Sequence, residues 1–292
     1  MLPILPVDGT LPPIADLLFL LLLAFAAGVV GAMLGLGGGL FMVPGLVVLF
    51  GVDIHLAVAA SLVGTIATSC GSASTHVEDG LTDLRVGMFL ETSTALGGLV
   101  GAVIAVTVLA SHAQVLIFAF VPVVLLAALL MFAHRTGDVQ ADPPHDRLAD
   151  RLHLGGDYVR RSGELVPYRV TGTGRGLVLV GFSGLGSGLL GIGGGLFNVP
   201  AMHSFMNVPM RVASATSIFM VGVTAAAGAF VYVVAGDVAL AVVAPVAIGI
   251  LAGSLVGTRV QSRASARGLR ELFIGVLIIA AGLMVVRGMG WL

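Results

Sequence analysis

Residues 34–44 read LGLGGGLFMVP, and residues 190–200 read LGIGGGLFNVP. Nine of the eleven positions are identical, which chance does not produce, so the chain contains an internal duplication. With the same offset of 156 residues and no gap, more pairs align outside the motif, among them Ser61 with Ser217 and Gly97 with Gly253. The sequence therefore predicts two homologous halves.

The composition is that of an integral membrane protein. Of 292 residues, 58% are hydrophobic and 10% are charged, whereas a soluble domain carries about a quarter charged residues. About 20 apolar residues suffice for one helical crossing of the bilayer. We expect an all-α fold with helices over residues 15–35, 56–74, 86–109, 115–133, 176–190, 212–235, 238–257 and 272–286. Two further runs, 40–50 and 196–205, are too short to span.

One long polar segment divides the chain. Residues 135–175 hold seven of the fourteen arginines. We predict a first transmembrane repeat over residues 1–134, a cytoplasmic linker over 135–175 and a second repeat over 176–292. The near-neutral net charge of -1 and the absence of lysine argue against nucleic acid as a partner. The single cysteine, Cys70, excludes an intrachain disulfide.

Arginine placement predicts the topology, because cytoplasmic segments collect Arg and Lys. The basic positions are Arg85, the linker, Arg211 and residues 259–270. Eight simple crossings would put the linker and the 259–270 segment on opposite sides of the membrane. We therefore expect each half to contain a broken or re-entrant hairpin, bent at the glycine-rich motif, and three to four transmembrane helices. With three full crossings, an odd number, the halves are inverted repeats and the basic segments all become cytoplasmic. A helix over residues 15–35 that crosses outright is the alternative.

The glycine-rich bends are the first candidate site. Non-helical backbone inside a membrane is tolerated only where protein or a water-lined cavity satisfies its polar groups, and transporters build substrate sites from such broken helices at a repeat interface. Glycines let backbone N–H groups approach a ligand, and a following helix start suits an anion. The predicted substrate-binding residues here are Gly37, Gly38, Gly39 and Pro44 in the first half and Gly193, Gly194, Gly195 and Pro200 in the second.

Close helix packing is the alternative explanation for glycines in a membrane protein. We prefer it for the scattered pairs Gly97 with Gly101 and Gly253 with Gly257, which recur at four-residue spacing. We prefer a binding site for the two triple-glycine bends, because packing alone rarely requires three adjacent glycines in both halves.

Polar residues near the bends extend the candidate site. Hydroxyls donate to oxyanions at a smaller desolvation cost than charges, so we include Ser61 and Thr65 in the first half and Thr216 and Ser217 in the second. Hydroxyls bonded to their own helix carbonyls are the alternative. Two further residues differ between the copies. Asn198 replaces Met42, and Arg211 is a candidate guide for anions, with a topology anchor as the alternative.

Glu91 is the candidate for proton coupling. It lies about two turns inside a predicted helix, and its counterpart in the second half is Ala247. An intramembrane carboxyl group is a functional candidate by default, and an interhelical hydrogen bond is the alternative role. The seven histidines show no metal-ligand spacing, so we expect no metal and no cofactor.

The duplicated Gly-x-Gly-Gly-Gly-x-x-x-Val-Pro element, together with RVASATS at residues 211–217, resembles the TauE/SafE family of membrane permeases, also called the TSUP family. The resemblance implies a multi-pass transporter of the cytoplasmic (inner) membrane. It also implies that the cargo is a sulfur oxyanion or organosulfonate such as sulfite, thiosulfate or sulfoacetate, often exported. A homodimer is compatible with it. The family pattern coincides with Gly37–Gly39, Pro44 and Ser61, and with Gly193–Gly195, Pro200, Thr216 and Ser217.

Two other functions are alternatives to a carrier. Inverted re-entrant hairpins also build anion channels, which the sequence does not separate from carriers. Gly181-Phe182-Ser183-Gly184 matches the short motif of intramembrane serine hydrolases. That chemistry needs a histidine base beside the serine, and no His is well placed within a full crossing, so we expect a transporter and no enzyme.

Overall fold

The computed structural model describes residues 14–78, 80–110, 113–133, 145–159, 165–263 and 266–288. The first half contains helices α1 (Ile14–Leu34), α2 (Gly39–Leu49), α3 (Ile54–Glu78), α4 (Leu84–Thr107) and α5 (Ala113–Ala133). The second half contains α7 (Thr173–Leu190), α8 (Gly195–Pro200), the π-helix η1 (Ala201–Phe205), α9 (Met210–Ala235), α10 (Leu240–Arg263) and α11 (Ala266–Gly288). Every predicted apolar stretch coincides with a helix, which confirms the all-α membrane class.

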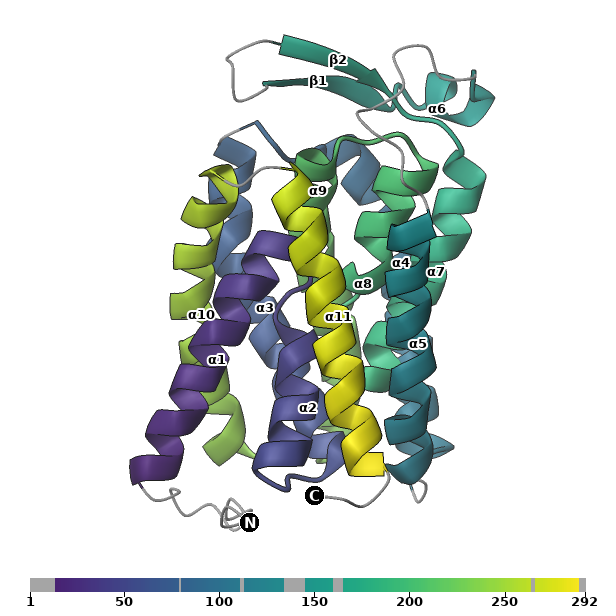
Figure 1. The fold of residues 1–292 in the computed structure, drawn as a ribbon. Helices are drawn as coiled ribbons and strands as arrows, with labels where there is room; N and C mark the ends of the chain where they lie inside the picture. Colours follow the sequence, from purple (N-terminus) through teal and green to yellow (C-terminus); the bar gives the residue numbers. More distant parts are fainter. Residues whose placement is uncertain are drawn as a thin grey trace.

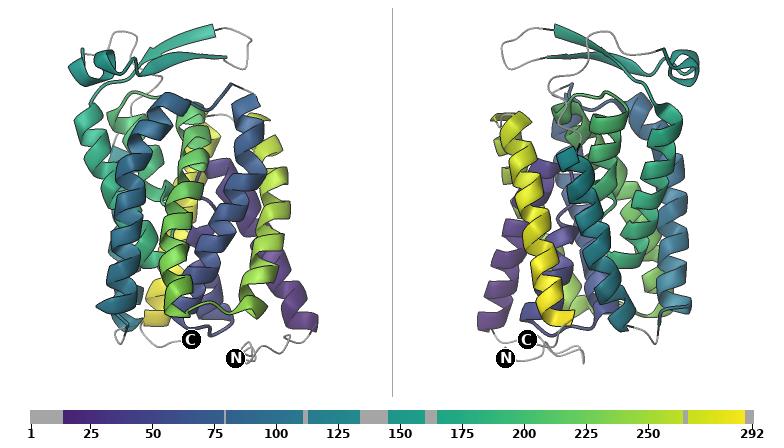
Figure 2. Two further views of the ribbon diagram at one scale, coloured as in Figure 1. Left: turned by 180° about the vertical axis from the view of Figure 1, so that it is seen from behind. Right: turned by 45° about the vertical axis from the view of Figure 1, so that its right-hand side comes forward.

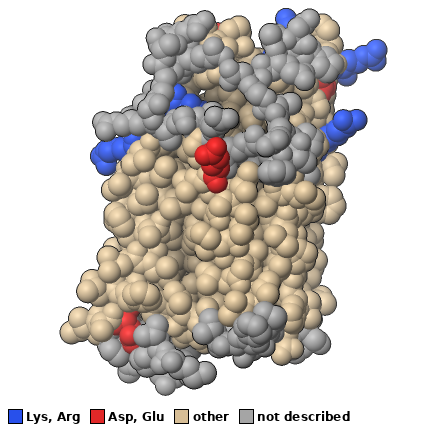
Figure 3. Space-filling model, viewed as in Figure 1, with Lys and Arg blue, Asp and Glu red and all other residues tan. Residues whose placement is uncertain are grey.

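The long helices have the length and composition of membrane spans. Among the described residues, five helices qualify, over Ile14–Leu34, Ile54–Val77, Leu84–Thr107, Met210–Ala235 and Leu240–Gln261. The space-filling view shows a broad uncharged band around the middle of the face seen, with blue arginines gathered toward one end (Figure 3). This banding is the pattern expected of a protein whose middle is in contact with lipid tails.

Each glycine-rich motif is the bend of a helical hairpin (Figure 1). In the first hairpin, α2 returns toward the start of α1, where the rings of Phe19 and Phe50 lie 5.6 Å apart between centroids. In the second, the N–H of Thr171, just before α7, donates to the carbonyl of Met206, just after η1, at 3.1 Å. Figures 1 and 2 show that the first hairpin opens at the end of the bundle where α1 begins and α11 ends, and the second at the other end.

The main helix contacts are exchanged between the halves. Helix α1 packs along α10, and its counterpart α7 packs along α4, the counterpart of α10. A Cβ on Gly253 would lie 2.0 Å from the carbonyl oxygen of Phe25, and one on Gly97 would lie 2.3 Å from that of Gly181. The scattered glycines therefore serve close helix packing, as their spacing predicts.

The described part of the linker forms a small cap, which we did not predict. It contains α6 (Arg147–Arg151) and an antiparallel pair of strands, β1 (Gly155–Val159) and β2 (Leu165–Arg169). Tyr158 and Tyr168 are buried, and their rings meet edge to face at 6.3 Å. The strands read GGDYV and LVPYR, and neither shows a regular alternation of apolar and polar residues that would distinguish it from a loop in the sequence. They lie at the end of the bundle where α7 and α9 begin (Figure 1).

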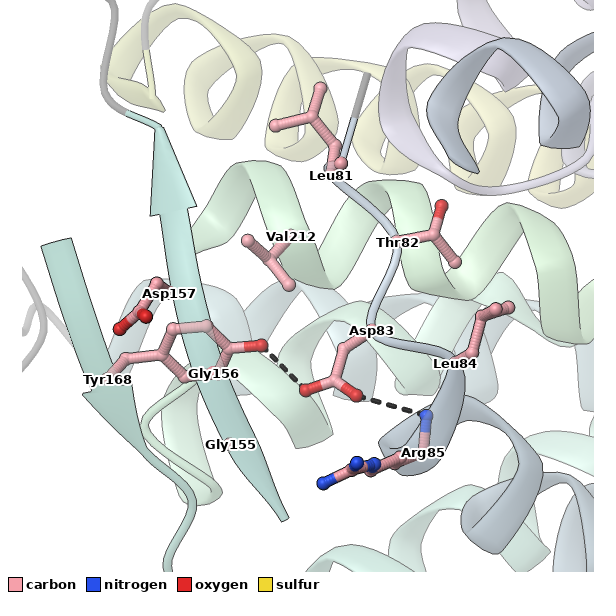
Figure 4. Close-up of a pocket in the computed structure, with 11 residues that line it drawn as sticks. Leu81, Thr82, Asp83, Leu84, Arg85, Gly155, Gly156, Asp157, Tyr168 and Val212 are labelled. Atoms are coloured by element: carbon pink, nitrogen blue, oxygen red, sulfur yellow. Dashed lines mark hydrogen bonds between the residues drawn. The ribbon is translucent and has the colours of Figure 1, made fainter. Parts of the chain in front are cut away.

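Asp83 joins this cap to the membrane helices. Its carboxylate caps α4 by accepting from the N–H groups of Arg85 and Val86, and it also accepts from the Tyr168 hydroxyl at 2.6 Å. Burial and the nearby carboxylates raise the pKa of Tyr168, so the phenol stays a donor. A pocket of about 290 Å³ lies at this junction (Figure 4). It is separate from the glycine-rich bends.

Candidate functional site

The two glycine-rich bends touch each other inside the bundle. Four of their glycines have φ between 73° and 83°, in the left-handed region that favours glycine: Gly37, Gly38, Gly193 and Gly194. A Cβ on Gly39 would lie 2.4 Å from the carbonyl oxygen of Gly191, and one on Gly195 would lie 2.0 Å from that of Gly35. Only glycine permits this approach, so these residues build the contact between the halves.

Two serines connect the bends crosswise. The Ser61 hydroxyl of α3 donates to the carbonyl of Gly191 in the second bend. The Ser217 hydroxyl of α9 donates to the carbonyl of Gly35 in the first bend, at 2.7 Å. Ser61 and Ser217 are counterparts in the repeat, and so are Gly35 and Gly191. Their hydroxyls therefore hold the opposite bend, instead of bonding back to their own helices.

The other predicted hydroxyls differ in their surroundings. Thr65 faces both bends: its side chain is the nearest neighbour of Gly37, and its hydroxyl donates to the carbonyl of Ser61 at 3.0 Å. Thr216 instead accepts from the backbone N–H of Asp83 at 2.9 Å, so its hydroxyl points toward the loop between α3 and α4. The structure therefore brings Thr65 to the bends and directs Thr216 away from them.

The remaining predicted residues lie at three different places. Pro44 is inside α2, and Pro200 is the last residue of α8, directly before the π-helical turn. Arg211 is half-buried in the first turn of α9. Asn198 is fully buried in α8, and neither polar atom of its amide has a hydrogen-bond partner in the structure. Because its amide is buried without hydrogen-bond partners, Asn198 is the best candidate among these residues for contact with a ligand.

Glu91 is buried between α4 and α9. One carboxyl oxygen accepts from Thr224 at 2.8 Å, and the other lies 3.2 Å from the Thr94 hydroxyl. A methyl carbon of Thr224 lies 3.5 Å from the position of a Cβ on Gly194. Glu91 is thus linked through one threonine to the second bend.

Residues 20–284 match the family described as "Sulfite exporter TauE/SafE". The chain belongs to this family. The match covers both hairpins, the linker and all of the candidate residues, which confirms the resemblance seen in the glycine-rich motif.

Two curated relatives of the TauE/SafE chain come from Bacillus subtilis (strain 168). "Probable membrane transporter protein YunE" is 26% identical over 279 residues, which cover 90% of this chain and 97% of the relative. "Probable membrane transporter protein YdhB" is 23% identical over 242 residues, which cover 83% and 89% of the two chains. No solved structure matches the chain. The family and both relatives identify a multi-pass membrane transporter.

Several polar residues at the second bend of this TauE/SafE protein were not predicted from the sequence. Ser187 of α7 is buried and lies 3.8 Å, at its hydroxyl, from the position of a Cβ on Gly194. Thr94, which was also not predicted, holds Glu91 together with Thr224, a residue of the polar face predicted for the second half. Aligning the two copies of the repeat could have identified them, because Ser187 and Thr94 are polar where their counterparts, Gly31 and Ile250, are not.

Ser183, the residue of the hydrolase alternative, also lies at this bend of the TauE/SafE chain. Its hydroxyl donates to the carbonyl of Gly194 and accepts from the N–H of Phe197 at 3.3 Å. Its side chain is therefore engaged on both sides by the backbone of the second hairpin. Among the described residues, no group of His, Cys, Asp and Glu side chains has the arrangement of a metal site.

Proposed function

We propose that this protein is a secondary transporter of a small sulfur-containing anion across the cytoplasmic membrane. The observation that carries the proposal is the direct contact of the two glycine-rich bends, held crosswise by Ser61 and Ser217. Broken helices that meet at a repeat interface are a recurrent way to build a transport site. The family description adds sulfite as the leading member of the substrate class.

Separation of the bends would make donors available to an anion. The hydroxyls of Ser61 and Ser217 would lose their carbonyl partners and could donate to oxyanion oxygens instead. Helix α2 begins at Gly39 without a side-chain cap, so its first N–H groups add to this set. The same contact between the hairpins is lined or shaped by Thr65, Pro44 and Gly193–Gly195. Arg211, at the start of α9, is the candidate guide for the anion.

A carrier fits the contact between the bends better than a channel does. Backbone atoms of Gly35 and Gly195 lie so close that even a methyl group would not fit between them. Passage past the bends therefore requires them to move, and each movement can serve one transport cycle. Flux that saturates with anion concentration and follows a proton gradient supports the carrier, whereas flux that stays linear in concentration supports the channel.

Inversion of the halves is the topology that we propose. It is supported by the first hairpin opening at one end of the bundle and the second at the end that bears the linker cap (Figure 1). Reporter fusions after residues 112 and 265, between α4 and α5 and between α10 and α11, should report opposite sides of the membrane. Reporters on the same side would refute the inversion.

The substrate class is tested with detergent-purified protein and a panel of sulfite, thiosulfate, sulfate, sulfoacetate, taurine and chloride. A ligand that binds only the folded state increases the free energy of unfolding, by about 2.7 kcal/mol when its concentration is a hundred times Kd, and so raises the melting temperature. We expect sulfite or an organosulfonate to raise it and to exchange across proteoliposomes. Chloride as the only stabilising anion would contradict the proposal.

A further inference from the structure

The second bend is surrounded by polar residues where the first bend has apolar ones. Four side chains differ between corresponding positions: Ser183 against Ala27, Ser187 against Gly31, Asn198 against Met42 and Thr94 against Ile250. Glu91 against Ala247 is a fifth difference. Around the first bend, the space beside Gly38 and Gly64 is filled by the terminal methyl group of Ile250, at 3.6 Å and 2.4 Å from the positions of their Cβ atoms. The two bends therefore offer different chemistry within one repeated backbone.

Two residues of this polar cluster have unmet hydrogen bonds. The Ser187 hydroxyl and both atoms of the Asn198 amide are buried without a partner, although each side chain is at most 1% exposed. Asn198 lies in the first turns of α8, four residues after its N-cap Gly194, and the nearest side chains to a Cβ on Gly194 are those of Thr224 and Ser187. A buried polar group without a partner costs about 1–3 kcal/mol, so such groups commonly mark ligand positions.

The cluster contains a carboxyl group, and the described arginines of the surrounding helices lie in the first turns of those helices. His203 of η1 has its Nδ1 atom 3.1 Å from the carbonyl oxygen of Val208. Helix α7 carries Arg175 in its first turn, where it is exposed, and α9 carries Arg211 in its first turn. Arg85, at the start of α4, reaches the carbonyl of His153 in the cap. The other titratable residue of α9, Tyr232, donates to the carbonyl of Gly188. Glu91 therefore faces hydroxyl groups and the second bend.

We propose that this cluster is the anion subsite and that it binds a singly charged oxyanion, such as hydrogen sulfite or an alkylsulfonate, in preference to dianions. The inference rests on the proposed function. Asn198 and Ser187 supply hydrogen bonds to sulfonyl oxygens, and Glu91, once protonated, adds no negative charge beside them. A second negative charge would enter a low-dielectric site without a cation to balance it, which is strongly unfavourable.

Replacement by the counterpart residue is the cleanest perturbation, because the other half accommodates that residue on the same backbone. We use Asn198→Met for this purpose and Ser187→Ala as a second, smaller change. Ser93→Ala is the matched control, because Ser93 lies on α4 near Thr94 but donates to Leu177 of α7. The purified full-length chain is titrated with methanesulfonate and with sulfate at constant pH and ionic strength, and the shift in melting temperature is followed.

We expect methanesulfonate to bind the wild-type protein at least tenfold more tightly than sulfate. Both variants should weaken methanesulfonate binding at least tenfold while the melting temperature without ligand stays at or above that of the wild type, and Ser93→Ala should bind normally. Wild-type affinity in Asn198→Met and Ser187→Ala, or tighter binding of sulfate, would overturn the subsite while leaving sulfur-anion transport intact. Failure of the wild type to bind or exchange any sulfur anion would refute the proposed function itself.

Discussion

Alanine at Gly195 should abolish transport and lower the stability of the purified protein by about 3 kcal/mol, the upper range for overpacking a buried site. The added methyl group would lie 2.0 Å from the carbonyl oxygen of Gly35 and 2.7 Å from the Cα of Leu36. Both neighbours are backbone atoms of the first bend, so no side chain can rotate to make room. The bends would have to separate, and the hydrogen bond from Ser217 to Gly35 would be lost.

A matched glycine distinguishes this effect from a general intolerance of alanine. Gly275 lies in α11, and a Cβ at its position would meet no heavy atom within 4 Å. Gly275→Ala should leave sulfite flux unchanged and keep or raise the melting temperature, because alanine favours helix over glycine by about 1 kcal/mol. Normal flux in Gly195→Ala proteoliposomes would show that contact between the bends is not required for transport.

Glutamine at Glu91 should remove the dependence of anion flux on pH. A substrate anion and an ionised Glu91 would repel each other in a site that the described arginines do not enter, so we expect one proton to accompany each anion. The structure can hold the neutral form: when Thr94 donates to the carbonyl of Leu90, its oxygen is free to accept from the protonated carboxyl group. Wild-type flux should increase as the pH falls, whereas Glu91→Gln mimics the protonated state at every pH.

The measurement is methanesulfonate uptake into proteoliposomes over a range of pH, with and without an imposed proton gradient, because methanesulfonate keeps a single negative charge throughout that range. Asp16→Asn is the matched control, since Asp16 is another buried carboxyl group but lies in the first turn of α1. It should keep the pH profile of the wild type. If Glu91→Gln also keeps that profile and still responds to the gradient, Glu91 acts through hydrogen bonding alone.

The sequence was most informative about features that repeat. Apolar length predicted the helices, and the duplicated motif predicted the two bends, because hydrophobic thickness and backbone conformation each leave a direct trace in residue type. The four-residue spacing of Gly97 and Gly101 likewise predicted close packing. These features depend on local composition, so they need no knowledge of which helices are neighbours.

The partners of individual side chains were beyond the sequence. Ser61 and Ser217 were correctly paired as counterparts, but their acceptors lie in the opposite half, and only the packing of the helices brings them there. Thr216 is adjacent to Ser217 in the chain yet points to a different loop, since neighbouring residues of a helix face different directions. The cap strands were missed because they are held by Tyr168 and Asp83, a contact between distant segments.

The exchange of helices between the halves also determines the order in which this protein can assemble. Gly28 of α1 packs against the backbone of Ile250, and Gly257 of α10 packs against that of Val29. During synthesis, α1 enters the membrane long before the ribosome has made α10. Until then, the glycine-rich surface of α1 is exposed to lipid. We therefore expect neither half to reach its native structure alone. Fragments that end before α10 are expected to be recognised by membrane quality control, whereas coexpressed halves can complete one another.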